Sequence, residues 1–135
     1  MAGYSGTPLA QKLGIKEGSR VAVVGAPKGF TESLTLPPRV VLRGQARGAL
    51  DVVVFFVTRY AELSRRFASM RRGLDDAGGL WIAWPKRASG VATDLSENPV
   101  REIGLANGLV DNKVAAIDDV WSGLRFVYRV ADRGR

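Results

Sequence analysis

The stretch Asp51-Val-Val-Val-Phe-Phe-Val57 is the clearest indication of the fold, because an unbroken β-branched and aromatic run is typical of a strand buried on both faces. Directly after it, an amphipathic helix is predicted from Tyr60 to Leu74, since its apolar residues recur every three or four positions. These residues are Tyr60, Leu63, Phe67, Met70 and Leu74. Residues 75–79 are expected to end the helix, and Leu80-Trp-Ile-Ala-Trp84 is predicted to form the next strand. Strand, helix and strand in this order predict a parallel α/β unit.

On the amino-terminal side, a short helix is expected between Thr7 and Gly14, followed by a buried strand from Arg20 to Val24. Pro37-Pro38 separates a loop or a single helical turn from a second strand, Arg39 to Leu42. The connection from Gly25 to Arg39 is short, so little helix is expected within it.

On the carboxyl-terminal side, a helix is predicted from Glu97 to Asn107, with Ser96 as its N-cap and Gly108 after its end. Two strands follow, Lys113 to Ile117 and Leu124 to Val130. Their short connection predicts an antiparallel hairpin at one edge of the sheet.

The elements together predict one α/β domain over residues 1–135, with residues 1–6 expected to be flexible. The fold class is Rossmann-like and three-layered, with a mostly parallel sheet and a C-terminal antiparallel hairpin at one edge. A chain of 135 residues has the usual length of a single domain.

The composition excludes several kinds of chemistry. The chain has no Cys and no His, which excludes zinc fingers, iron–sulfur centres, disulfide scaffolds and catalytic triads with an imidazole. We therefore predict no metal site. The net charge is +7, from 20 basic and 13 acidic residues, which favours anionic partners. Fifteen of the basic residues are Arg, which fits either bidentate anion binding or the codon usage of a GC-rich genome.

Nothing in the sequence indicates a membrane or export pathway. The start, Met1-Ala-Gly-Tyr-Ser-Gly6, does not have the pattern of a signal peptide. The longest apolar run, Val52 to Val57, is far shorter than the ~20 residues that span a bilayer. We therefore expect a cytoplasmic protein without membrane contact.

Four motifs carry a family resemblance. They are Leu80-Trp-Ile-Ala-Trp-Pro-Lys86, Ser89-Gly90 with Thr93-Asp94, Gly108-Leu-Val-Asp-Asn-Lys113, and Trp121-Ser-Gly-Leu-Arg-Phe126. Together they resemble a small bacterial domain-of-unknown-function family that is commonest in actinobacteria. The likeness covers nearly the whole chain and is looser between Phe30 and Leu50. This resemblance implies no activity, substrate or catalytic residue.

The order of the elements also resembles a shortened methyltransferase-type Rossmann fold, which implies a site for S-adenosylmethionine. The pattern departs from that family at two positions. Gly25-Ala-Pro-Lys-Gly29 replaces a G-x-G-x-G loop, and Pro27 lacks a backbone N–H that such a loop uses. Arg43 and Gly44 stand where an acidic residue would hold ribose hydroxyls. We expect no cofactor, with S-adenosylmethionine or a nucleotide as the alternative.

The leading prediction is a crevice for a small anionic ligand, because ligands of open parallel sheets bind at the carboxyl ends of the strands. Three loops meet there: Gly25 to Phe30, Thr58-Arg59, and Pro85 to Asp94. Their cations, hydroxyls and glycines suit a phosphate or a carboxylate. The candidate ligand-binding residues are Gly25, Lys28, Gly29, Thr58, Arg59, Lys86, Arg87, Ser89, Gly90 and Thr93. The alternative is that these are ordinary solvated loop residues.

Three classes of function follow. The first is a non-enzymatic binding or interaction module that uses this crevice. The second is a reduced methyltransferase-like enzyme with Asp94 as the candidate catalytic residue, although Asp94 is also well placed to start the following helix. The third is a weak, non-specific nucleic-acid binder that contacts phosphates through Arg65, Arg66, Arg71 and Arg72. These four arginines equally fit a solvated helix face.

The C-terminal hairpin adds one partner to these predictions. An edge strand has unpaired backbone groups, which favour pairing with the same edge of a second copy. A homodimer through the hairpin edge is therefore possible in addition to a small anionic ligand.

Overall fold

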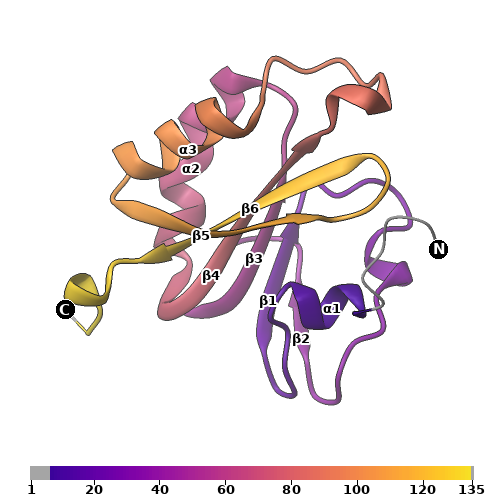
Figure 1. Cartoon of the computed structure of the whole chain (residues 1–135). Helices are drawn as coiled ribbons and strands as arrows, with labels where there is room; N and C mark the ends of the chain where they lie inside the picture. The colour runs from indigo at the N-terminus through magenta and orange to yellow at the C-terminus, as the bar shows by residue number, and fades with distance from the viewer. Residues whose placement is uncertain (1–6, 135) are drawn as a thin grey trace.

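The computed structural model describes residues 7–134, so the predicted flexibility of residues 1–6 lies outside the described part of the chain. Six strands form one sheet in the order β2-β1-β3-β4-β6-β5 (Figure 1). The strands are β1 (Arg20–Val24), β2 (Val41–Arg43), β3 (Leu50–Phe56), β4 (Leu74–Pro85), β5 (Leu109–Ala116) and β6 (Trp121–Tyr128). The helices are α1 (Leu9–Lys12), α2 (Tyr60–Arg72) and α3 (Glu97–Ala106), with short 3-10 helices η1 (Thr31–Ser33), η2 (Arg87–Ser89) and η3 (Val130–Asp132).

The sheet is mostly parallel, as predicted. β1 pairs in parallel with β2 and β3, and β3 pairs in parallel with β4. The C-terminal strands β5 and β6 form an antiparallel hairpin that pairs with β4 through β6. β5 therefore lies at one edge of the sheet and β2 at the other. This confirms the predicted α/β class with a C-terminal antiparallel hairpin.

β3 lies in the middle of the parallel part, and its run from Val52 to Val57 is buried throughout. Successive side chains of a strand point to opposite faces of the sheet. Val53 and Phe55 accordingly belong to one apolar core, and Val52 and Val54 belong to another. This single apolar run thus supplies side chains to both faces of the sheet.

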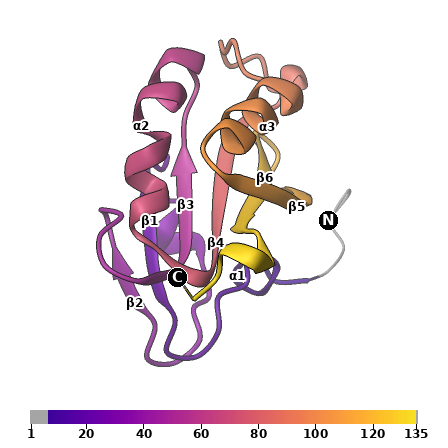
Figure 2. The same ribbon diagram turned by 90° about the vertical axis from the view of Figure 1, so that its left-hand side faces the viewer.

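The helices α2 and α3 cover one face of the sheet side by side (Figures 1 and 2). Leu63, Phe67 and Met70 of α2 are buried there, and the rings of Phe67 and Phe126 meet edge to face with centroids 5.6 Å apart. α3 comes close to β6 at Gly104, where a Cβ would lie only 2.0 Å from the Phe126 ring. We call this the helical face.

The opposite face is covered by the four-residue α1 and by the segment 26–40, and we call it the loop face. Trp81 of β4 is fully buried there and donates from Nε1 to the Leu13 carbonyl oxygen at 3.0 Å. Phe30 packs against Phe56 with ring centroids 4.7 Å apart. The sheet with its two covers has the predicted three layers.

The predicted end of the second helix was wrong, because residues 75–79 belong to β4 and do not form a turn. The pairing with β3 jumps from Leu50↔Leu74 to Val52↔Gly79, so the extra residues form an irregular bulge within the strand. A close backbone contact requires glycine at Gly78, and Gly79 leaves room for the Arg125 side chain. A Cβ on Gly78 would lie 2.7 Å from the Leu50 carbonyl oxygen, and one on Gly79 would lie 2.3 Å from Arg125 Nε.

The predicted bounds of three other strands differ from those observed. β5 begins at Leu109, earlier than predicted, because the chain turns at Gly108 (φ +85°) directly from α3 into β5. β6 also begins earlier than predicted, at Trp121. The predicted end of the last strand at Val130 was wrong, since Val130 lies beyond β6 in η3 and is 77% exposed. β2 is displaced toward Arg43 because Arg39 has a φ of 63°, which is incompatible with a strand.

Among the described residues, no helix has both the length and the apolar character needed to cross a bilayer.

Candidate functional site

The carboxyl ends of β1, β3 and β4 lie at the same edge of the sheet, because these strands are parallel neighbours. Two contacts join the loops that follow them. Gly25 has a φ of +70° and comes so near β3 that a Cβ would lie 2.9 Å from the Phe56 carbonyl oxygen. Thr93 Oγ1 donates to the Thr58 carbonyl oxygen at 2.6 Å. The three loops predicted to converge are therefore adjacent.

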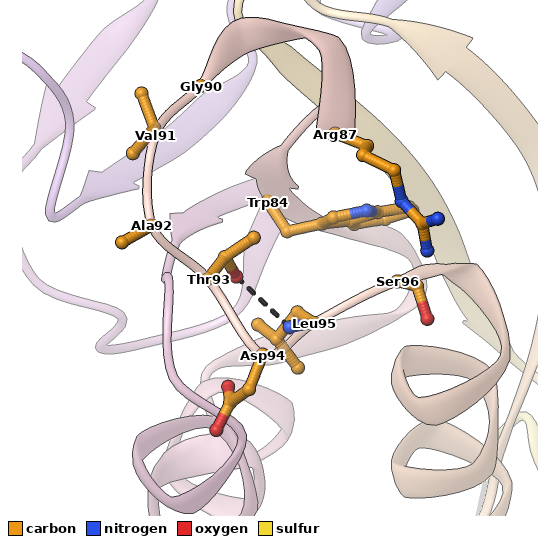
Figure 3. Close-up of a pocket in the computed structure, with 9 residues that line it drawn as sticks. All are labelled: Trp84, Arg87, Gly90, Val91, Ala92, Thr93, Asp94, Leu95 and Ser96. Atoms are coloured by element: carbon orange, nitrogen blue, oxygen red, sulfur yellow. Dashed lines mark hydrogen bonds between the residues drawn. The ribbon is translucent and has the colours of Figure 1, made fainter.

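A pocket of about 480 Å³ opens at this edge, between the end of β4 and the start of α3 (Figure 3). It is lined by Trp84, Arg87, Gly90, Val91, Ala92, Thr93, Asp94, Leu95 and Ser96. We call this the β4–α3 pocket. Its wall is mainly the single connection that leaves β4, passes through η2 and enters α3.

The polar groups of this pocket favour an anion. Figure 3 shows the exposed Arg87 side chain extending alongside the Trp84 ring. Ser96 is the N-cap of the ten-residue α3, yet its side chain makes no capping hydrogen bond. The first N–H groups of a helix lack partners within it and carry a partial positive charge. A guanidinium and a helix start thus face one hollow.

Asp94, the candidate catalytic residue, points away from the pocket toward α2 (Figure 3). Its Oδ1 accepts a hydrogen bond from the Tyr60 backbone N–H at 2.7 Å, at the first residue of α2. The N-cap of α2, Arg59, makes no side-chain capping bond itself. Asp94 therefore caps the preceding helix from a distance in sequence, and the expectation that it starts the following helix was wrong. A carboxylate at a helix start is stabilised by the unpaired N–H groups there.

Two of the predicted ligand-binding hydroxyls shape the loop around the pocket. Thr93 Oγ1, besides its bond to Thr58, accepts the Leu95 N–H at 3.0 Å (Figure 3). Ser89 Oγ donates to the Lys86 carbonyl oxygen at 2.6 Å and accepts the Val91 N–H at 3.2 Å. These bonds hold the connection in one conformation, so the two residues position the wall of the pocket.

The predicted ligand-binding set therefore divides in two. Arg87, Gly90 and Thr93 line the β4–α3 pocket. The others do not line it: Gly25, Lys28, Gly29, Thr58, Arg59, Lys86 and Ser89. Lys28, Gly29 and Arg59 are exposed in the neighbouring loops.

Sequence reasoning missed several lining residues, chiefly Trp84 and Ser96. Trp84 was predicted only as the end of a strand, and Ser96 only as a helix cap. Ser96 could have been found, since a helix start next to the loop after β4 places N–H groups at the edge already chosen for the ligand. Nothing in the sequence indicates that Val91, Ala92 and Leu95 line a hollow.

The predicted basic patch on α2 does not face water as a unit. Arg65 and Arg72 are exposed. Arg66 pairs with Glu62 (Nη1 to Oε2, 2.9 Å), and its guanidinium lies 4.8 Å from the centroid of the Phe55 ring. Arg71 is half-buried with its guanidinium 5.4 Å from the centroid of the Tyr128 ring. Arg66 and Arg71 therefore fit the alternative of a solvated helix face only in part, because each guanidinium contacts an aromatic face and each side chain is half-buried.

The residues expected to hold S-adenosylmethionine do not fit that cofactor. Gly25 provides a close approach, but Pro27 lacks an N–H, and the loop leads into the three-residue η1. A Rossmann phosphate or cofactor loop opens a full helix, whose N–H groups it presents to the ligand. At the end of β2, Arg43 supplies a cation where ribose hydroxyls require a carboxylate.

Comparisons with known proteins support the fold. No protein-family model matches the sequence, and no curated protein matches it either. Solved structures of methyltransferases do match. Magnesium protoporphyrin IX methyltransferase from Synechocystis PCC 6803 with bound S-adenosylmethionine is 16% identical, with a TM-score of 0.60 over 90% of this chain and 74% of that chain. A SAM-dependent methyltransferase from Aquifex aeolicus is 16% identical, with a TM-score of 0.60 over 87% and 86%.

Fibrillarin from Aeropyrum pernix, in complex with natively bound S-adenosylmethionine, is 19% identical, with a TM-score of 0.59 over 88% of this chain and 73% of that chain. At these identities the likeness defines the fold, which is a methyltransferase-like Rossmann fold. The predicted resemblance to a methyltransferase-type fold is thereby confirmed, while membership of the domain-of-unknown-function family stays a prediction.

Proposed function

We propose that the chain is a non-enzymatic binding module that takes a small anionic ligand in the β4–α3 pocket. One observation carries this proposal: Arg87 and the uncapped start of α3 at Ser96 face the same hollow of about 480 Å³. A guanidinium binds a phosphate or carboxylate through two parallel hydrogen bonds, and a helix start adds favourable dipoles. The Trp84 ring offers an apolar wall for the rest of the ligand.

The same pocket offers little support for catalysis. The chain has no His or Cys, so a general base would have to be a carboxylate, a lysine or a tyrosine. Asp94 is the only carboxylate among the lining residues of this pocket, and it accepts the N–H of Tyr60 at the start of α2. A carboxylate that points away from the pocket and already accepts a backbone N–H is poorly placed to take a proton from a substrate bound there (Figure 3).

The proposal is tested by the thermal stabilisation that bound ligand confers, since binding to the folded state raises its stability. The probes are inorganic phosphate, pyrophosphate, citrate and a nucleoside monophosphate at millimolar concentration. Arg87→Ala is compared with Arg129→Ala, which removes the same charge from an exposed position after β6. We expect at least one probe to raise the Tm, and Arg87→Ala to weaken its binding about tenfold.

Two results would refute the proposal. Either no probe shifts the Tm, or Arg87→Ala and Arg129→Ala weaken binding equally, which would reduce the effect to net charge.

The fold favours a second candidate, a reduced S-adenosylmethionine-dependent methyltransferase. This candidate predicts that S-adenosylmethionine raises the Tm and that Asp94→Asn abolishes turnover while ligand affinity is kept. Because Pro27, η1 and Arg43 do not fit the cofactor, we expect S-adenosylmethionine to leave the Tm unchanged. A clear stabilisation by S-adenosylmethionine would reverse the order of the two candidates.

A further inference from the structure

A second region lined by arginines lies beside the edge strand β2. After β2 the chain crosses toward α2 through residues 44–47, and Ala46 packs against Gly73 at the end of that helix. This crossing segment separates two hollows. The larger, about 600 Å³, is lined by Arg43, Gly44, Gln45 and Arg47. The smaller, about 290 Å³, lies between the segment and α2.

Both hollows are lined by arginines, and no carboxylate is among their lining residues in the described part of the chain, although Arg66 is paired with Glu62. Arg47 lines both hollows. Arg43 lines the larger hollow, and Arg66 of α2 lines the smaller one. The remaining lining residues are uncharged: Val24, Gly44, Gln45, Ala46, Ser69 and Met70. Arg43 and Arg47 thus share the larger hollow, and Arg47 and Arg66 share the smaller one. We call these two adjoining hollows together the arginine groove. The convergence of cations from separate elements raises the local positive potential.

Two of these guanidinium groups are held in place by the protein. Arg43 Nη1 donates to the Arg47 carbonyl oxygen at 3.2 Å, and it lies 3.5 Å from where a Cβ on Gly48 would stand. Arg66 Nη1 donates to Glu62 Oε2 at 2.9 Å, above the Phe55 ring. A positioned guanidinium loses less side-chain entropy when it binds an anion than a free one.

We propose that the arginine groove binds a phosphate-bearing ligand, with Arg43 and Arg47 as the groups that contact the phosphate. Guanidinium groups match the geometry of phosphate oxygens, and no carboxylate lines either hollow to repel an anion. Phosphate can come from a free phosphorylated compound or from a nucleic-acid backbone. No aromatic residue lines either hollow, so bases have no ring to stack on and recognition rests on phosphate.

The experiment measures two probes on the full chain: inorganic pyrophosphate by calorimetry, and a fluorescein-labelled single-stranded oligonucleotide by anisotropy. The variant Arg43→Ala/Arg47→Ala is compared with Lys16→Ala/Arg129→Ala, which removes the same charge. Lys16 precedes β1 and Arg129 follows β6, so neither side chain lines the groove. We expect the groove variant to weaken binding of at least one probe by about tenfold or more, and the control to weaken it far less.

A charge-conserving variant separates geometry from charge. Arg43→Lys/Arg47→Lys keeps both positive charges but loses the planar two-donor geometry, so its affinity should lie between those of the wild type and the alanine variant. For the oligonucleotide, the alanine variant should also flatten the dependence of affinity on salt, because fewer phosphates are neutralised.

The outcomes divide clearly. Groove-dependent binding of pyrophosphate identifies a free phosphorylated compound as the source, and groove-dependent binding of the oligonucleotide alone identifies nucleic acid. If neither probe binds, or if the groove variant and the control lose affinity equally, the proposal is refuted. Pyrophosphate binding by Arg87→Ala is measured in parallel. Binding that this variant loses belongs to the β4–α3 pocket, and binding that the groove variant loses belongs to the arginine groove, so the two sites are tested separately.

Discussion

The helical face and the loop face bury similar kinds of apolar side chains but cover them by different means. On the helical face, the 13-residue α2 and the ten-residue α3 supply the cover through interlocking rings and aliphatic side chains. On the loop face, the longest helix is the four-residue α1, and residues 26–40 supply most of the rest. A parallel sheet therefore needs apolar cover on both sides but does not need helices to provide it.

The two faces should also differ in local stability. A long helix opens cooperatively with the core beneath it, whereas a short helix and loops can open while most of the core stays packed. The loop face is also held by individual hydrogen bonds. The most buried of these runs from Trp81 Nε1 to the Leu13 carbonyl oxygen. We therefore expect substitutions on the helical face to destabilise the whole protein, and substitutions on the loop face to act more locally.

The largest effect is expected for Phe67→Ala on the helical face. Phe67 is fully buried and packs edge to face on Phe126, so its loss leaves a cavity between α2 and the sheet. The free energy of unfolding should fall by about 3–5 kcal/mol. Urea denaturation followed by tryptophan fluorescence measures it. Tyr60→Ala is the control, because Tyr60 is in the same helix but 43% exposed, and an equal loss there would contradict the prediction.

A smaller effect is expected for Trp81→Phe on the loop face. The aromatic character is conserved, but the Leu13 carbonyl oxygen loses the donor that satisfies it. The cost should be about 1–3 kcal/mol. Hydrogen exchange should show where it falls: the amides of Lys12, Leu13 and Ile15 should exchange faster than in the wild type, while those of α2 change much less. Equal acceleration in both regions would mean that the loop face does not open separately.

The next effect is expected at Asp94, which ties the β4–α3 pocket to α2. Asp94→Ala removes the side-chain acceptor at the start of α2 and should cost about 0.5–2 kcal/mol. Asp94→Asn should cost much less, because asparagine is an equally good N-cap. Thermal denaturation of both variants tests this. If the asparagine variant is destabilised as much as the alanine variant, the contribution of Asp94 comes from its charge and not from the capping bond.

The smallest effect is expected for Arg125→Met. Arg125 points to the loop face, because its strand neighbours Leu124 and Phe126 face the helices. Burial lowers the pKa of the Arg125 guanidinium, and the Arg133 charge lowers it further. Since no carboxylate among residues 7–134 forms an ion pair with Arg125, its burial as a cation is uncompensated. The variant should be as stable as the wild type or more stable.

The sign of the pH dependence follows from the direction of that shift. When the pKa of a base is lower in the folded than in the unfolded state, the charged base destabilises the folded protein. This holds at every pH below the pKa of the folded state. For an arginine this range includes all of neutral pH, so the stability difference between wild type and Arg125→Met should be constant there. A difference that changes between about pH 6 and about pH 9, measured by urea denaturation, would point to another group.

Much of the fold could be predicted because the apolar pattern reports burial directly. The runs at Arg20–Val24 and 51–57, and the stripe at Leu63, Phe67 and Met70, correspond to β1, β3 and α2 within a residue or so. The start of β4 could not be predicted, because Gly78-Gly79 has the composition of a turn. Gly78 instead allows a close approach to the Leu50 carbonyl oxygen, which is a tertiary contact.

The site was predictable to the level of the sheet edge and not to the level of the side chains. Because β1, β3 and β4 are parallel neighbours, the loops that follow them lie at the same edge of the sheet. Arg87, Gly90 and Thr93 do line a pocket there. The capping role of Asp94 toward α2 joins residues 34 positions apart, which no local pattern can reveal. The arginine groove was missed for the same reason, because its cations come from three separate elements.

The two margins of the sheet differ in a way that limits how copies of the molecule can associate. Two β5 edge strands related by a twofold axis would pair and form a closed dimer. A β5 edge paired with a β2 edge would instead leave one unpaired edge on each copy, so that repeated pairing would build a fibre. The open-ended arrangement has little to build on, because β2 offers only three residues for pairing. The short length of this edge strand thus opposes runaway polymerisation.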